Sequence, residues 1–298
     1  MLIREDQSAG YGKPARAVII TADDFGFSRE VNAAVINTFQ HGVLTAASLM
    51  VAGAARDEAA SLAREHPDLD VGLHLVVCRG LSVLAPERLA GIVDALGRFG
   101  QQPILAGLKY FFDPRVRGCL RDELRAQIDT HYELVGYLNH LDGHLNFHVH
   151  PVIAAILIEL ATEYRIPYIR LPREPLLTNL RLAQDHFARK IIESIIFKTL
   201  SRRMFKTMRA RGIRTTDRVF GLYQTGLVTE AYIIELIARL PIGTSEIYFH
   251  PAEDVGLSLP PSATRTEAQI LKSSRVRQAL TDAGARLTSF AEVAHAQT

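Results

Sequence analysis

The chain combines two adjacent aspartates with an unusual concentration of histidines. Asp23 and Asp24 follow an apolar, β-branched run, and His74 stands inside another apolar run. Four of the eleven histidines fall between positions 140 and 150. Carboxylate and imidazole groups are common ligands of catalytic divalent metals. These residue types therefore indicate metal-assisted hydrolysis.

The aspartate pair allows a division of roles. Two adjacent carboxylates cost free energy if both are buried and ionised. They could simply cap the helix predicted at residues 30–40, because aspartate favours helix starts. Neighbouring side chains point in different directions, however. One carboxylate could therefore bind a metal while the other faces the reacting water.

The histidine-rich segment supplies further ligand candidates. Asp142 and His144 stand at positions i and i+2, so they share one face if the segment is a strand. Together with His74, such a set would suit Zn²⁺, Fe²⁺, Co²⁺ or Ni²⁺, would accept Mg²⁺, and would leave positions open for catalysis. In the alternative interpretation, His74 is a core residue and the later histidines lie in an exposed loop. We expect such exposure for His140 and His150.

Two further residues stand near predicted strand ends. His250 precedes a proline, and imidazole is well suited to protonate a leaving amine near neutral pH. A buried core position is the alternative for this histidine. Arg170 could orient a carboxylate, and a surface salt bridge would explain it equally well.

Several other catalytic arrangements are absent from the sequence. It has no Gly-x-Ser-x-Gly, no His-Glu-x-x-His, no Gly-Lys-Ser/Thr loop and no Gly-x-Gly-x-x-Gly after the first predicted strand. Covalent serine catalysis and nucleotide binding are therefore disfavoured. A glycoside hydrolase is an alternative, although adjacent aspartates are poorly arranged for it. A protein that binds a sugar-lipid without cleaving it is another.

Short β-rich runs alternate with helical patterns, which predicts parallel strands joined by crossover helices. We expect strands at residues 17–21, 45–50, 70–75, 139–144, 167–171, 218–222, 246–250 and 286–290, and helices at residues 30–40 and 151–164. A single-domain irregular (β/α) barrel with seven or eight parallel strands, spanning residues 1–298, is the simplest α/β fold. The polar candidates then lie at the carboxyl ends of strands, where such barrels place their active sites.

The bulk composition is that of a globular protein. Of 298 residues, 48% are hydrophobic and 22% charged, and the net charge of +2 gives no reason to expect a nucleic-acid partner. The two cysteines are far apart, and no apolar run reaches the roughly 18 residues of a membrane span. The first six residues lack the apolar region of a signal peptide. We therefore expect a cytoplasmic protein.

Positive charge is concentrated in one segment. Between Arg181 and Arg214 there are ten Lys or Arg residues and two acids. Apolar residues recur at helical spacing, at Phe187, Ile191, Ile195, Leu200, Met204 and Met208. We predict a basic amphipathic helical insert at about residues 176–214. It either packs on the barrel or rests on anionic lipid at the inner face of the membrane, where each nearby cation adds roughly 1 kcal/mol.

These motifs resemble the YdjC-like (chitooligosaccharide deacetylase) family, and more closely its hopanoid-biosynthesis-associated branch. The resemblance is carried by residues 21–26, 72–75, 141–144, 148, 169–172, 217–222 and 246–252. It implies a polysaccharide-deacetylase-like barrel, one divalent ion (Zn²⁺ or Mg²⁺) and hydrolysis of the N-acetyl group of an amino sugar. The chitooligosaccharide-type pattern has a denser histidine run where this chain has Leu145, Asn146 and Phe147. This departure favours a more apolar substrate, and the branch implies an N-acetylglucosaminyl lipid, namely an N-acetylglucosaminyl hopanoid.

The resemblance also implies individual roles. Three residues become metal ligands: Asp24, His74 and His144. Asp23 becomes the general base and His250 the candidate acid. We further expect four residues to contact the substrate: Phe25, Asp142, His148 and Arg170.

Overall fold

The structure, a computed structural model, describes residues 16–89, 91–254 and 259–295. The N-terminal segment on which the signal-peptide prediction rests lies outside these residues. The strands are β1 (Arg16–Phe25), β2 (Ala46–Leu49), β3 (Asp70–Leu75), β4 (His140–Gly143), β5 (Tyr168–Ile169), β6 (Arg218–Phe220), β7 (Gly243–Phe249) and β8 (Ala285–Leu287). Each of the eight predicted strands overlaps one of them.

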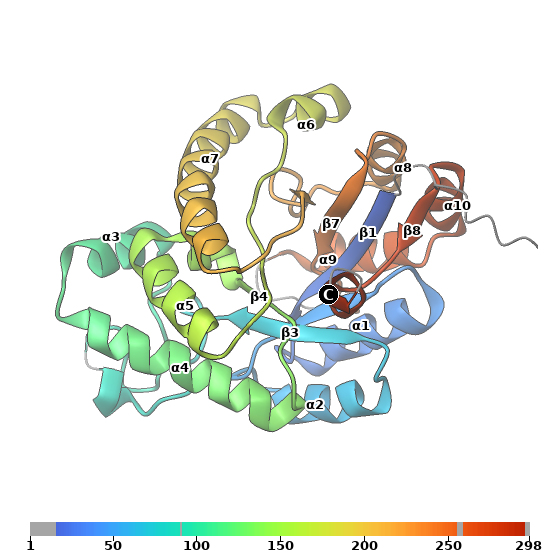
Figure 1. Ribbon diagram of the computed structural model, residues 1–298. Helices are drawn as coiled ribbons and strands as arrows, with labels where there is room; N and C mark the ends of the chain where they lie inside the picture. Colours follow the sequence, from blue (N-terminus) through green and yellow to red (C-terminus); the bar gives the residue numbers. More distant parts are fainter. Residues whose placement is uncertain (1–15, 90, 255–258, 296–298) are drawn as a thin grey trace, which may run out of the picture.

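Helices connect and cover the strands (Figure 1). They are α1 (Arg29–His41), α2 (Arg56–Glu65), α3 (Pro103–Phe112), α4 (Val116–Val135), α5 (Pro151–Glu163), α6 (Leu176–Leu182), α7 (Phe187–Ala210), α8 (Glu230–Ala238), α9 (Pro261–Leu271), α10 (Ser274–Asp282) and α11 (Phe290–His295), with short 3₁₀ helices η1 (Pro86–Leu89) and η2 (His144–Val149). Both predicted helices are present, as α1 and α5.

The strands form one curled parallel sheet in the order β5-β4-β3-β2-β1-β7-β6. β8 pairs with the first residues of β1, and β2 pairs with its later residues. The sheet path ends at β5 and β6, so the sheet forms an incompletely closed barrel. This confirms the predicted fold class, an irregular (β/α) barrel. Parallel order also places all carboxyl ends of the strands at one rim.

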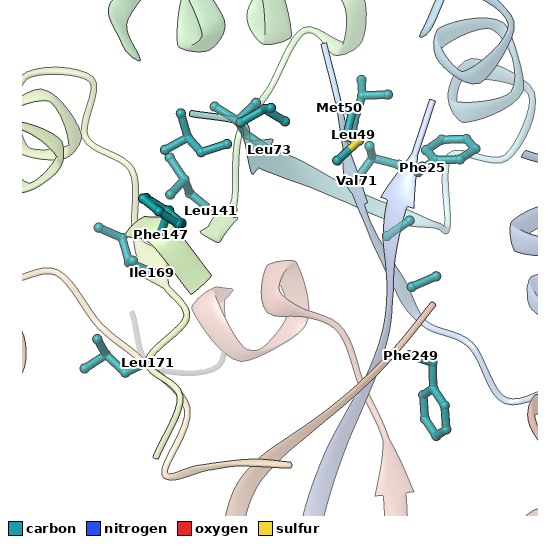
Figure 2. Packing of buried hydrophobic residues seen from close by; sticks show 14 of the residues in the cluster. Phe25, Leu49, Met50, Val71, Leu73, Leu141, Phe147, Ile169, Leu171 and Phe249 are labelled. Atoms are coloured by element: carbon teal, nitrogen blue, oxygen red, sulfur yellow. The ribbon is translucent and has the colours of Figure 1, made fainter. Parts of the chain in front are cut away.

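The strands pack into a continuous apolar core (Figure 2). Leu49, Leu73, Leu141 and Ile169, from four neighbouring strands, are fully buried. Parallel strands covered by helices are buried on both faces, which is why these segments read as near-continuous apolar runs. The polar residues embedded in these runs are therefore exceptions that need a structural or chemical reason.

The aspartate pair lies within β1, not after it as predicted. The pairing of β1 with β2 shifts register between Ala22 and Phe25, and Asp24 has a left-handed backbone with a φ of 65°. A bulge of this kind redirects a side chain that would otherwise point to the opposite face. Both carboxylates can therefore serve the same site, although adjacent residues of a regular strand cannot.

The aspartates do not cap the following helix. Ser28 is the N-cap of α1, and its side chain accepts a hydrogen bond from the Val31 N–H. Asn32 of the same helix accepts a hydrogen bond from the Gly26 N–H. With helix capping assigned to other residues, the aspartate pair is left for the site.

The basic segment forms α6 and the long α7, whose two halves differ. Met204 and Met208 in the second half are buried against the barrel, while Arg202, Arg203 and Lys206 stay exposed. In the first half, however, Phe187 and Ile195 are exposed, although both belong to the predicted apolar face of the helix. Within the described residues, no helix combines the length and apolar character needed to cross a bilayer.

Candidate active site

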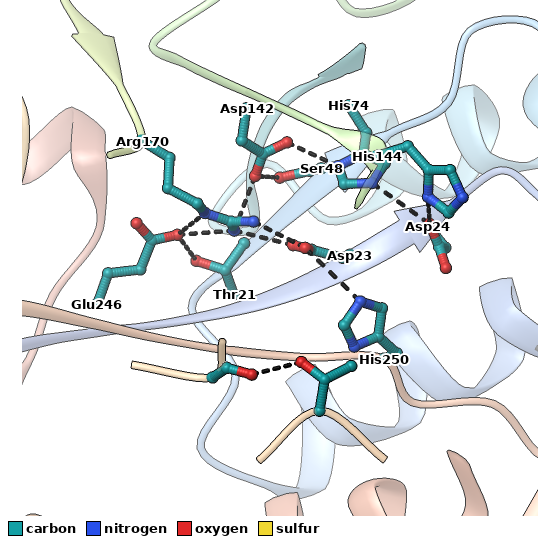
Figure 3. Close-up of polar contacts among 12 residues, drawn as sticks. Thr21, Asp23, Asp24, Ser48, His74, Asp142, His144, Arg170, Glu246 and His250 are labelled. Atoms are coloured by element: carbon teal, nitrogen blue, oxygen red, sulfur yellow. Dashed lines mark hydrogen bonds and ion pairs between the residues drawn. The ribbon is translucent and has the colours of Figure 1, made fainter. Parts of the chain in front are cut away.

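Side chains from five strand ends converge at the carboxyl rim of the barrel (Figure 3). Asp24 comes from the end of β1, His74 from β3, and His144 follows β4 as the first residue of η2. Nδ1 of His144 lies 3.1 Å from Asp24 Oδ1, and Nε2 of His74 lies 3.3 Å from the same oxygen. All three side chains are buried.

These three side chains offer one ligand atom each within a space that fits a single metal ion. Their ligand atoms lie within 4.8 Å of one another. Two imidazoles and a carboxylate, with further positions open, are the donor set of a catalytic divalent site. The structure therefore brings together the residues that were predicted to bind metal.

The orientation of the His74 ring supports such a site. Its Nδ1 lies 2.7 Å from a carboxylate oxygen of Asp142, so this nitrogen carries the proton and donates it. Its Nε2 is buried without a hydrogen-bond partner. A carboxylate that fixes the far nitrogen of a metal-binding histidine is a common feature of metal centres. Nε2, which makes no hydrogen bond but lies 3.3 Å from Asp24 Oδ1, is then the atom available to a metal ion.

Opposite charges hold these side chains together. Burial alone would lower the pKa of His74, but the charge and hydrogen bond of Asp142 outweigh it and raise this pKa to about 10. Burial would raise the pKa of Asp24, yet His144 and His74 hold it well below its usual value. A ligating imidazole must give up its extra proton, so metal affinity should fall as the pH is lowered.

A buried arginine lies beneath the metal-ligand candidates. Nη1 and Nη2 of Arg170 donate to the two carboxylate oxygens of Asp23 over 2.7 and 2.8 Å. The same guanidinium lies 2.7 Å from Asp142 and from Glu246, and over the Tyr248 ring. These charges outweigh the effect of burial and raise the pKa of Arg170. Of the two sequence interpretations for Arg170, the one that orients a carboxylate is the one observed.

His250 stands on the other side of Asp23. Its Nε2 lies 3.9 Å from Asp23 Oδ2, and its Nδ1 lies 3.9 Å from Glu267. The His250 side chain is 14% exposed, whereas those of the metal-ligand candidates are 2–3% exposed. A base candidate and an acid candidate therefore border the same space, with the imidazole nearer to solvent.

The four residues predicted to contact substrate lie beneath the site. Phe25, Asp142, His148 and Arg170 are all buried. Asp142 accepts a hydrogen bond from Ser48, and His148 donates one to the Arg170 carbonyl. Burial lowers the pKa of His148 to about 4, which keeps it neutral. The contact of these four residues with substrate therefore stays a prediction.

The expected exposure of His140 and His150 is wrong. The His140 ring is buried, stacks on Phe290 with a centroid distance of 4.0 Å, and occupies the space above Gly72 that a Cβ would fill. His150 is half-buried beside aromatic rings. Both rings pack against apolar groups, so neither belongs to a solvated loop.

Sequence reasoning missed several partners of the site. Glu246 of β7 accepts hydrogen bonds from Arg170 and Thr21, and the His250 N–H donates to Glu267 over 2.5 Å. Glu246 stands four residues before His250, on the same face of a strand, and this period of two could have revealed it. Glu267 lies on α9 in an amphipathic pattern, where no local signal marks it.

An apolar groove borders the site. It has a volume of about 540 Å³ and is lined by α3, η2 and α7. Leu145 and Phe147 of η2 form part of its wall, directly after His144. Leu108 of α3 and Ile196 of α7 line it from two other sides. One short segment therefore joins the candidate metal site to an apolar surface.

The fold and site define a barrel hydrolase with a candidate metal centre, and sequence comparison gives its family. The chain matches the YdjC-like protein family over residues 17–282, and it belongs to that family. A carbohydrate deacetylase of Brevibacillus brevis is 31% identical over 93% of this chain and 99% of its own length. A human carbohydrate deacetylase is 29% identical over 84% and 78% of the two chains. The chain is therefore an enzyme of the carbohydrate deacetylase class, a hydrolase of amide bonds.

Solved structures show the same fold. A crystal structure of an Enterococcus faecalis V583 protein assigned to cellobiose-phosphate cleavage superposes with a TM-score of 0.72, at 23% identity, over 94% of this chain and 99% of that one. The family 4 carbohydrate esterase domain of a xylanase from the hindgut metagenome of Trinervitermes trinervoides gives a TM-score of 0.50 at 10% identity, over 95% and 91% of the two chains. Both likenesses concern the fold.

Proposed function

We propose that this enzyme hydrolyses the N-acetyl group of a lipid-linked N-acetylglucosamine at the rim described above, releasing acetate and a free amine. The observation that carries the proposal is the buried triad of Asp24, His74 and His144 beside Asp23. Within the branch that the sequence resembles, the lipid is a hopanoid.

The triad would hold one divalent ion, Zn²⁺ or Mg²⁺. When bound, such an ion supplies Lewis-acid polarisation of a carbonyl and lowers the pKa of a coordinated water. Asp142 accepts a hydrogen bond from the Nδ1–H of His74, which leaves the Nε2 lone pair available to bind the ion. Asp24, at its bulge, directs its carboxylate between the two imidazoles.

The protein's own groups then move the protons. Asp23 accepts a proton from the water while the water oxygen forms a bond to the amide carbon. Arg170 holds both Asp23 oxygens and fixes the direction of that carboxylate. As the carbon–nitrogen bond breaks, His250 donates a proton to the sugar nitrogen, and acetate remains. Arg170, Asp142 and His148 are thus positioning residues in this proposal.

The metal role of the triad has a direct test. His74→Ala removes one of the three proposed ligands. The purified variant should therefore contain little divalent metal, while its circular dichroism stays unchanged. Elemental analysis gives the metal-to-protein ratio. As a matched control, His140→Ala removes another buried strand histidine outside the triad and should keep its metal. Full occupancy in His74→Ala would disprove the assignment.

The apolar groove supports a lipid-linked substrate. A sugar whose acetamido group lies at the triad has its aglycone close to Leu145 and Phe147, because η2 runs from the site directly into the groove. Burying an apolar aglycone there would stabilise the complex by about 25 cal/mol per Å² of apolar surface. A free sugar would gain nothing from the same surface.

The deciding experiment measures acetate release from an N-acetylglucosaminyl lipid and from soluble N-acetylglucosamine. We expect turnover of the lipid, loss of turnover with a chelator, and a KM for the lipid that rises about tenfold in Leu108→Ser or Ile196→Ser. Neither groove variant should change activity on the soluble sugar. Ile242→Ser, which replaces an exposed residue outside the groove, is the control.

Two results would contradict this proposal. Release of a sugar instead of acetate would identify a glycosidase. Equal effects of the groove variants on both substrates would mean that the groove does not bind the lipid.

A further inference from the structure

Large apolar side chains are exposed on both helices that flank the groove. On α7 these are Phe187, Ile192, Ile195 and Ile196, with Ile195 64% exposed. On α3 they are Ile104, Leu105, Leu108, Phe111 and Phe112, with Ile104 78% and Phe112 72% exposed. Scattered apolar residues are normal on a protein surface, but a concentration on two adjoining helices marks an interaction surface.

The two sets form one surface. Residues of α3 and of α7 line the same groove, with Ile196 and Phe197 facing Leu108 and Phe111 across it. In Figure 1, α7 stands beside α3 and α5 at one side of the molecule. We name this surface, formed by the exposed residues of α3 and of α7, the α3–α7 surface.

Positive charge continues from the apolar part of α7. The exposed face changes within one turn from Ile195 and Ile196 to Lys198, and then to Arg202, Arg203 and Lys206. α3 contains no acid, and the one acid of α7, Glu193, is half-buried and pairs with Arg189. The surface therefore combines aliphatic and phenyl groups with cations that have no acidic neighbours on these helices.

We propose that the α3–α7 surface docks on an anionic phospholipid bilayer. Exposed lysines, Lys109, Lys198 and Lys206, stand among the apolar members of this surface, and lysine is depleted at protein interfaces. An interfacial helix inserts apolar side chains into the boundary between headgroups and acyl chains, and places Lys and Arg beside the anionic headgroups. The groove then opens at the membrane, where a lipid-linked sugar resides.

The two halves of the basic helix have different roles in this proposal. The second half of α7 follows the packed interpretation, because Met204 and Met208 are buried with a solvated basic face. The first half does not pack in this way and offers its apolar residues to solvent. The apolar and the charged parts of the docking surface therefore lie in succession along the helix.

Co-sedimentation with vesicles tests the docking without substrate. The full chain should bind phosphatidylcholine vesicles that contain phosphatidylglycerol. Its binding should be at least about tenfold weaker when the vesicles contain phosphatidylcholine alone, or when the salt concentration is high. The triple change Arg202→Gln, Arg203→Gln and Lys206→Gln should weaken binding about tenfold or more. The double change Ile192→Ser and Ile195→Ser, outside the groove lining, should do the same.

Matched controls replace equivalent exposed residues elsewhere. Arg239→Gln, Arg265→Gln and Lys272→Gln together remove the same charge from α9 and from the C-caps of α8 and α9, and Ile242→Ser removes an exposed isoleucine. These proteins should bind vesicles as the unchanged chain does. Activity on soluble N-acetylglucosamine should be equal in all variants, so a failure of the proposed reaction and a failure of docking are read separately.

Three outcomes would overturn the proposal. The first is no binding to anionic vesicles at low salt. The second is equal loss in the surface and control variants. The third is self-association that depends on protein concentration and is abolished by the double change Ile192→Ser and Ile195→Ser, in a protein that does not bind vesicles. This result would identify a second copy of the chain as the occupant of the surface.

Discussion

Asp23→Asn is expected to lower turnover by about a hundredfold or more while leaving the metal content unchanged. Loss of a general base costs about 10²–10⁴-fold in rate. Asn keeps the size of the side chain, and Asp23 is outside the set formed by Asp24, His74 and His144. Acetate release under saturating substrate, together with elemental analysis of the same sample, checks both halves of the prediction.

The neighbouring residue provides the matched comparison. Asp24→Asn makes the same chemical change one residue away, and should weaken metal binding itself, because the carboxylate lies between His74 and His144. If Asp23→Asn retains near-normal turnover while Asp24→Asn still binds metal tightly, the two roles are assigned to the wrong residues.

Arg170→Met is expected to reduce the free energy of unfolding by about 3–5 kcal/mol, because it leaves buried carboxylates without their cation. Asp23, Asp142 and Glu246 all contact this guanidinium. Chemical denaturation at neutral pH measures the loss. Arg125→Met is the control: Arg125 pairs with Glu163 at the surface, and exposed pairs contribute only about 0–1 kcal/mol.

The loss should also depend on pH. Arg170 holds the pKa of Asp142 below its usual value, so its stabilising contribution is present above the ordinary carboxyl range and declines as the pH falls. In the variant, buried carboxyl groups can protonate and then need no cation. The difference in the free energy of unfolding between the unchanged protein and Arg170→Met should therefore become smaller at acidic pH. A pH-independent difference would mean that Arg170 stabilises the barrel through packing.

Local sequence was sufficient to predict the strands, and the family resemblance supplied the candidate metal ligands that the structure brings together. Apolar, β-branched runs identified all eight strands, and parallel order brought Asp24, His74 and His144 to one rim. The bulge in β1 was not predictable in this way, because it depends on how β1 pairs with β2. Without that pairing, both aspartates appear to follow the strand.

The burial and the partners of individual side chains were harder to predict than the strands that carry them. Whether Arg170 meets solvent or three carboxylates is decided by strands β1, β4 and β7, which are distant in sequence. Likewise, α7 has one apolar periodicity along its length, but Met204 and Met208 of its second half are buried while Ile195 and Ile196 of its first half are exposed. Tertiary contact, which periodicity does not encode, separates the two halves.

The placement of η2 limits how this enzyme can change its substrate during evolution. Its first residue, His144, belongs to the candidate metal-ligand set, and the next three, Leu145, Asn146 and Phe147, line the groove, two of them with left-handed backbones. A substitution in η2 that reshapes the groove would also displace a ligand. Descendants that accept a different aglycone should therefore accumulate their adaptive substitutions on α3 and α7, whose side chains can vary without moving the catalytic centre.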